Sequence, residues 1–260
     1  MARVFSQYLI NVAWHAREYE PIMFAGRHGY GVEIEDFRPV EVIDNPQERA
    51  RLVSWYREQL RQVPGLISVH APYEGVTPGS SRPTAAARAR MTACLETAEA
   101  LGVPRVVFHA AAERVAPEDR DGWRDRQAAR WREALAGRDV EVMLENEWET
   151  DPEFLRDAVD AVGLTNVGAC LDVGHAHLYA RVPVSRWVEV LGPRIRHLHL
   201  HDNEQRKDDD QHLLPGRGTI DWEGFVSAMR AQGLCPPAVI ELGSIDPRTI
   251  DMGFLEQINR

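Results

Sequence analysis

Short runs of apolar residues alternate with longer amphipathic stretches along the whole chain. Eight of these runs are rich in Val and Ile and have the length of buried strands. The stretches between them repeat apolar residues at helical spacing, for example over residues 45–62, 82–101 and 119–136. The runs cover residues 3–10, 31–37, 66–73, 105–111, 140–147, 167–177, 195–203 and 237–244. The pattern predicts eight strands that alternate with helices.

Strands and helices that alternate over 260 residues are typical of one α/β domain, a parallel (β/α)8 barrel or TIM barrel. An open, doubly wound sheet is the alternative. It is less favoured because no G-x-G-x-x-G motif follows the first predicted strand. Since there is no linker or low-complexity segment, we expect a single barrel domain over residues 1–260.

The charge and the cysteines narrow the classes of partner and compartment. The chain has 30 basic and 40 acidic residues, a formal net charge of -10, which argues against a general binder of polyanions. Cys94, Cys170 and Cys235 form no CxxC pair and no even disulfide framework, which fits a reducing compartment. No window is long and apolar enough for a membrane span. We therefore expect a cytoplasmic protein with no membrane partner, and homo-oligomers stay open.

Titratable residues recur near the carboxyl ends of the predicted strands, from the third strand onward. The βα loops of a barrel meet at that end, and barrel enzymes have their active sites there. The strand-end residues are His70, His109, Glu145, Asp172, His199 and Glu241, and the loops add His175, Asp210 and His212. Any one of them alone would be read as a hydrogen-bonded histidine or a helix cap.

Their recurrence on successive strands points instead to a metal site. Burying several carboxylates and imidazoles together is costly unless their charge is compensated, and a divalent cation provides that compensation. Mixed nitrogen and oxygen ligands suit Zn, Mn or Fe better than Ca or Mg. We therefore expect a divalent cation of this kind at the ends of the predicted strands.

Seven motifs, in this order and spacing, resemble the xylose isomerase-like barrel superfamily. The superfamily includes sugar and sugar phosphate isomerases and epimerases, and abasic-site nucleases of the endonuclease IV type. The motifs are "VHAPY", "FHAA", "LENE", "LDVGHAH", "HLHLHDN", "DQHLLPGRGTIDW" and "IELGS". The resemblance covers nearly the whole chain from the third predicted strand onward.

The resemblance implies two nested ligand sets, and with them one to three cations per chain. The nuclease-type set holds three metals with Glu145 as the bridging carboxylate, and all nine of its ligands have counterparts here. They are His70, His109, Glu145, Asp172, His175, His199, Asp210, His212 and Glu241. The epimerase-type set holds one metal with four of these residues: Glu145, Asp172, His199 and Glu241.

The residues within two of these motifs favour the branch of sugar isomerases and epimerases. "CLDVGHAHLYA" and "PGRGTIDW" are similar to sugar isomerases and epimerases rather than to the nuclease. We therefore expect a metal-dependent isomerase or epimerase of a small sugar or sugar phosphate. In such an enzyme Glu145 and Glu241 would relay a proton at a carbon beside a metal-polarised carbonyl.

The alternative is an endonuclease IV-like phosphodiesterase with several metals, acting on abasic DNA or on a small phosphate ester. DNA is the less favoured partner, because phosphate contacts dominate DNA affinity and the loops carry no concentration of basic residues.

Side chains alternate along a strand, so His197, His199 and His201 share one face, which would point into the barrel. His197 would be a deep, hydrogen-bonded imidazole and His201 a rim residue that touches substrate. Arg217 and Trp148, both on loops, are further candidate substrate contacts. Glu33 and Glu35 also share one strand face, which leaves two readings open: one of them points into the barrel near the site, or they have a core or rim role.

Overall fold

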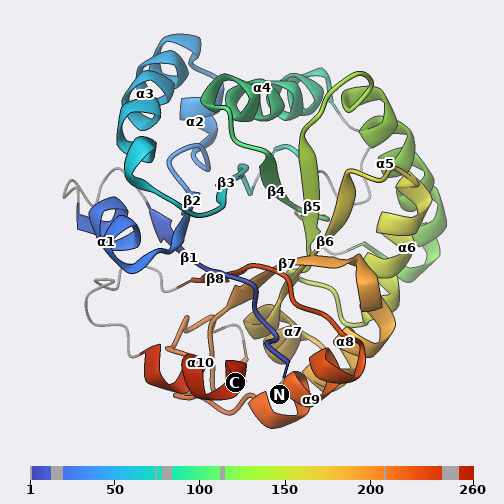
Figure 1. Cartoon of the computed structure of the whole chain (residues 1–260). Helices are drawn as coiled ribbons and strands as arrows, with labels where there is room; N and C mark the ends of the chain where they lie inside the picture. Colours follow the sequence, from blue (N-terminus) through green and yellow to red (C-terminus); the bar gives the residue numbers. More distant parts are fainter. Residues whose placement is uncertain are drawn as a thin grey trace.

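The computed structural model is a closed barrel of eight parallel strands with helices around it (Figure 1). The structure describes residues 2–12, 20–73, 75–77, 84–111, 115–207, 209–241 and 252–260. The strands are β1 Tyr8–Val12, β2 Gly31–Ile34, β3 Ile67–His70, β4 Arg105–His109, β5 Glu141–Glu145, β6 Val167–Asp172, β7 Ile195–Leu200 and β8 Ala238–Ile240. Each strand pairs with the next, and β1 pairs with β8. The predicted (β/α)8 barrel is confirmed.

Helices form the outer layer of the barrel (Figure 1). They are α1 Glu20–His28, α2 Val40–Ile43, α3 Pro46–Gln59, α4 Ala85–Leu101, α5 Arg120–Ala134, α6 Pro152–Val162, α7 Val173–Tyr179, α8 Val184–Leu191, α9 Trp222–Ala231 and α10 Met252–Asn259. Short 3-10 helices lie at Leu60–Gln62, Pro117–Asp119 and Gly192–Arg194. No helix in the described ranges combines the length and the apolar character that crossing a bilayer requires.

The predicted helices agree with α3, α4 and α5, and the 3-10 turn after α3 completes the stretch to residue 62. The predicted start of α4 at residue 82 lies outside the described residues. Local capping explains where α3 begins: the Asn45 side chain accepts hydrogen bonds from the backbone of Gln47 and Glu48, and Pro46 occupies the first turn.

The first strand differs from the prediction, because β1 begins only at Tyr8. Val4 and Phe5, which opened the predicted run, are buried in the core. Their backbone N–H groups donate to the side-chain oxygen of Asn259, both at 2.9 Å. The apolar pattern therefore identified Val4 and Phe5 as buried residues, but the prediction that they belong to the first strand was wrong.

Strand alternation separates the barrel interior from the layer between strands and helices. Leu198 and Leu200 on β7 are fully buried in the core beneath the helices. The alternate residues of neighbouring strands point inward, where Val107, Met143 and Cys170 form a second apolar cluster. This cluster lies one inward-facing position below the polar strand ends, so it forms an apolar support beneath them.

The strand register brings the polar strand ends side by side. His109 on β4 is paired with Glu145 on β5, and Asp172 on β6 is paired with His199 on β7. Because the strands are parallel, these residues reach the same end of the barrel. The fold thus gathers side chains from distant parts of the sequence at one mouth.

Asn146, one residue beyond β5, connects two of these strand ends. Its side-chain amide donates to the Asp172 carbonyl, and its side-chain oxygen accepts from the Asp172 N–H, both at 2.9 Å. All of these atoms belong to buried residues. The pair of hydrogen bonds fixes Glu145 and Asp172 relative to each other.

Asn146→Ala should therefore lower the free energy of unfolding of the metal-free protein by about 2–6 kcal/mol, since two buried groups of Asp172 lose their partner and each unsatisfied buried group costs about 1–3 kcal/mol. Urea denaturation measures the effect. Asn166→Ala is the matched control, because the Asn166 amide makes one partly buried hydrogen bond, to the Val140 carbonyl at 2.8 Å. Equal losses in the two variants would contradict the role assigned to Asn146.

Candidate metal centre

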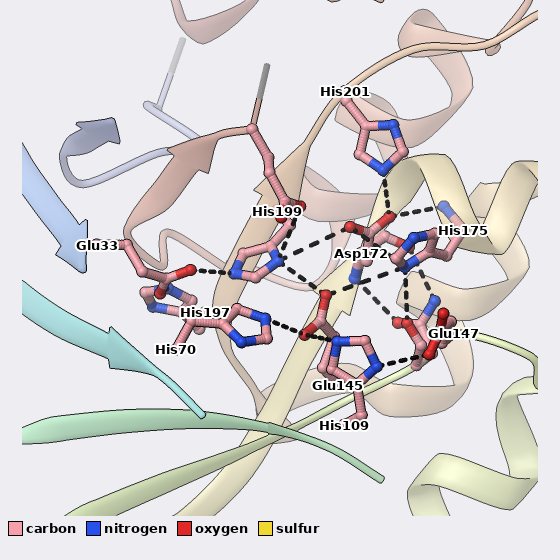
Figure 2. Close-up of polar contacts among 12 residues, drawn as sticks. Glu33, His70, His109, Glu145, Glu147, Asp172, His175, His197, His199 and His201 are labelled. Carbon is pink, nitrogen blue, oxygen red and sulfur yellow. Dashed lines mark hydrogen bonds and ion pairs between the residues drawn. The ribbon is translucent and has the colours of Figure 1, made fainter. Parts of the chain in front are cut away.

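The nine predicted ligands meet at the mouth of the barrel, as three groups of side chains. Figure 2 shows His70, His109, Glu145, Asp172, His175 and His199 among them. Strand ends supply most of them, α7 supplies His175, and the loop between β7 and α9 supplies Asp210 and His212. We call them the central, the bridging and the outer group. Glu145 belongs to both the central and the bridging group.

The central group consists of Glu145, Asp172, His199 and Glu241, whose ligand atoms all lie within 4.8 Å of one another. The Nδ1 atom of His199 is 2.8 Å from Glu145 Oε1 and 3.3 Å from Glu241 Oε2. Asp172 Oδ2 and Glu241 Oε2 are buried without a hydrogen-bond partner among the described residues. Three buried carboxylates around one imidazole need a positive charge, so this group fits a divalent cation.

The bridging group places two imidazoles at the second oxygen of Glu145. His70 Nε2 is 3.1 Å and His109 Nε2 is 3.3 Å from Glu145 Oε2. The other ring nitrogens donate outward, His70 Nδ1 to the Ala71 carbonyl at 2.8 Å and His109 Nδ1 to Glu147 at 2.6 Å. In the neutral ring, both Nε2 lone pairs then face a carboxylate oxygen, and a metal ion resolves that repulsion.

The outer group repeats this arrangement around Asp210. His175 Nε2 and His212 Nε2 lie 3.2 Å and 2.8 Å from Asp210 Oδ2. Their Nδ1 atoms donate to the carbonyls of Asn146 and Glu241, both at 3.2 Å. His212 has a φ of 44°, in the left-handed region that a non-glycine residue rarely adopts. Such backbone strain is typical of functional positions.

His199 lies against a polar chain on the barrel floor. Its Nε2 lies 2.9 Å from Glu33 Oε1, while Glu33 Oε2 accepts from Ser68 at 2.7 Å and from His197 Nε2 at 3.2 Å. Arg105 donates to His197 Nδ1 at 3.2 Å, which fixes the tautomer that donates to Glu33. A carboxylate behind a ligand histidine is a common support of metal sites.

The charges packed into the site shift the pKa values of its members. Burial alone would raise the pKa values of Glu145 and Glu241, but the charge of His199 outweighs it and lowers both well below their ordinary range. Burial would lower the pKa of His175, but the charge of Asp172 and the hydrogen bond to Asp210 raise it well above its usual value. Metal ions must therefore displace protons from this centre.

The three residues predicted to contact substrate differ in their exposure to solvent. The rim position expected for His201 is wrong, because its side chain is fully buried and lies 3.0 Å from Asp172 Oδ1. Trp148 is half-buried and donates from Nε1 to the Tyr73 hydroxyl at 2.8 Å. Arg217 lies in the exposed part of the loop between β7 and α9. Substrate contacts of Trp148 and Arg217 stay predictions.

Sequence reasoning placed His197 correctly, as a buried, hydrogen-bonded imidazole. It indicated only that Glu33 and Glu35 share a face, and it did not find their roles. Glu35 accepts from Arg38 at 3.3 Å, and the same guanidinium lies 3.8 Å from Glu241 Oε1. Nothing in the sequence around Arg38 marks it as part of the site, because it lies beyond the end of β2 without a motif.

Comparisons with known proteins concern the family and the fold. Residues 30–257 match the profile of a family described as "Xylose isomerase-like TIM barrel". The chain is 28% identical over 246 residues to "Probable endonuclease 4" of Mycobacterium leprae, covering 86% of this chain and 92% of that protein. It is 30% identical over 213 residues to the protein of the same description from Mycobacterium ulcerans, covering 76% and 81%.

Solved structures show the same fold. A "D-tagatose 3-epimerase-like protein" has a TM-score of 0.76 at 20% identity, with 97% of this chain and 96% of that chain covered. A Thermus thermophilus protein soaked with ZnCl2 has a TM-score of 0.74 at 23% identity, with 97% of each chain covered. At these identities the similarity shows the fold alone, so the reaction must be inferred from the residues of the site.

We predict that the metal-free protein loses stability as the pH rises toward 9. Burial would lower the pKa of His212, but the hydrogen bond to Asp210 and the charge of Glu241 raise it from 6.5 to about 9. A raised histidine pKa stabilises the fold fully below 6.5, and that contribution is lost as the pH passes through about 9.

Thermal unfolding with a chelator present should therefore show a falling Tm between pH 6.5 and 9, and His212→Gln should show a shallower decline. Saturating Zn²⁺ should offset the loss, because zinc binds the neutral ring of the native state. A constant or rising Tm in the metal-free wild type would contradict the assignment.

Glu33→Gln should weaken metal binding by about 10–100-fold, the usual effect of removing a carboxylate behind a ligand histidine. Competition with a chromophoric chelator measures the affinity. Glu35→Gln is the control: Glu35 follows on the same face, but its carboxylate contacts Asn11 and Arg38 rather than a ligand imidazole. The role of Glu33 would be refuted by equal affinities in the two variants.

Proposed function

The chain belongs to the xylose isomerase-like TIM barrel family, and we propose that it is a metal-dependent phosphodiesterase whose three ligand groups hold up to three divalent cations. The family contains enzymes of more than one reaction class, so the ligands of this chain must distinguish between them. The ligand types favour Zn, Mn or Fe.

One observation carries the proposal: both carboxylate oxygens of Glu145 are engaged. Oε1 faces His199 at 2.8 Å in the central group, and Oε2 faces His70 at 3.1 Å and His109 at 3.3 Å in the bridging group. A carboxylate between two ligand groups is suited to link two cations. It is poorly suited to take a proton from a sugar carbon, because neither oxygen is left for that task.

The sequence by itself favours the isomerase or epimerase, and the position of Glu145 favours the hydrolase. When bound, the cations would neutralise a phosphate ester and stabilise the charge that develops on its oxygens. The chain adds Arg38, whose guanidinium lies beside Glu35 and Glu241 at the mouth. Guanidinium groups bind phosphate oxygens in a fork geometry, so Arg38 would orient the ester.

The relatives named "Probable endonuclease 4" support an abasic site in duplex DNA as the first substrate to test. The net charge of -10 supports a small phosphodiester as the second. Both substrates contain a phosphodiester bond, so cleavage of either one would support the proposed reaction. The comparison of the two tells whether the enzyme acts on DNA or on a small molecule.

A second candidate is the sugar epimerase. It is favoured by the central group, which contains the four ligands that the epimerase branch uses. Glu145 and Glu241 come from β5 and β8, on different walls of the barrel. In that enzyme the two carboxylates would exchange a proton with the carbon between them.

Zinc- or manganese-loaded protein should cleave an abasic duplex at low salt or bis(p-nitrophenyl) phosphate, and Glu145→Gln should reduce the rate by about a hundredfold or more, beyond the effect of losing a supporting residue. Glu58→Gln is the control, because it makes the same chemical change on the exposed surface of α3. Deuterium exchange into a ketose that requires Glu145, without hydrolysis of either ester, would establish the epimerase instead.

A further inference from the structure

His201 lies directly after β7 and is fully buried beside α7. Gly174 on α7 makes room for it: a Cβ atom there would lie 2.1 Å from His201 Cε1. The ring is therefore held in a space that any larger residue at position 174 would close. None of the nine implied ligands is this residue, so its placement needs a separate explanation.

The hydrogen bond of His201 defines its free nitrogen. Nε2 lies 3.0 Å from Asp172 Oδ1, and because a carboxylate only accepts, Nε2 donates. In the neutral ring Nδ1 then carries a lone pair. This Nδ1 has no hydrogen-bond partner among the described residues. A buried nitrogen of this kind is costly unless a ligand meets it.

The free nitrogen faces the outer group. His201 Nδ1 is 3.8 Å from Asp210 Oδ1, and the ring stacks on that of His212 with centroids 4.0 Å apart and planes 4° from parallel. One ligand atom each from His175, His201, Asp210 and His212 lies within 4.8 Å of all the others. Figure 2 shows His201 above Asp172, with its bonded nitrogen pointing down to that carboxylate.

We propose that His201 is a fourth protein ligand of the cation in the outer group. Three imidazoles and one carboxylate supply the four protein ligands of a tetrahedral zinc site. Asp172 supports this role, because one of its oxygens orients His201 and the other belongs to the central group.

The proposed role of His201 concerns only metal retention, so it does not depend on which substrate the enzyme acts on. A buried imidazole that served only to donate to Asp172 would leave zinc retention in the outer group unchanged. Zinc counting under chelator challenge therefore separates the two roles without an activity assay.

The experiment measures zinc per chain by elemental analysis over a series of chelator concentrations. Asp210→Asn identifies the zinc that belongs to the outer group, because that fraction should be lost. His201→Phe keeps a buried ring but removes both nitrogens, and it should release the same fraction at about tenfold lower chelator or less, with the remaining zinc retained. His177→Gln is the control: this histidine also lies on α7, but it contacts Thr219.

His201→Gln distinguishes a ligand from a hydrogen-bond donor, since its Nε2 amide group matches the position of the ring Nε2 and can still donate to Asp172, but it offers no ring nitrogen at the position of Nδ1. It should weaken the same zinc as His201→Phe does. Zinc retention equal to that of His177→Gln, in either His201 variant with native circular dichroism, would overturn the proposal. So would a wild type in which Asp210→Asn removes no zinc.

Discussion

The site depends on one electrostatic constraint: carboxylates and imidazole lone pairs converge in a buried space. Glu145, Asp172 and Glu241 surround one ring nitrogen of His199, and two of their oxygens have no partner among the described residues. Such a cluster is unstable unless a positive charge occupies it. The raised pKa values of His175 and His199 indicate that protons supply this charge when metal does not. The apolar support below the site and the hydrogen bonds around it hold this cluster together.

The support is divided between two sides of the barrel interior. Beneath β4, β5 and β6, the apolar cluster of Val107, Met143 and Cys170 packs under the strand ends. On the other side a polar chain through Glu33 and His197 reaches His199 from the floor. Packing restricts where the strand ends lie, and the Glu33 carboxylate lies behind the ring nitrogen of His199 that faces away from the ligand groups. Both are needed, because a metal site tolerates only small errors in ligand position.

The barrel fold is shared by proteins of different reaction classes, so the fold does not select the reaction. The ligand groups are more informative. A single metal needs only the central group, whereas this chain also places His70 and His109 on the second oxygen of Glu145 and builds the outer group around Asp210. Burial of these further titratable side chains costs free energy unless they bind something, so the geometry favours a centre with several metals.

The sequence by itself determined the order of strands and helices, the barrel, and the nine residues that meet at its mouth. It could do so because strand periodicity and strand ends are local features, and parallel strands in a barrel bring their carboxyl ends together. The tertiary structure alone decided the roles of Glu33 and Arg38, the burial of His201, and the position of Glu145 between two groups. Those properties arise from contacts between residues far apart in the chain, which no local pattern encodes.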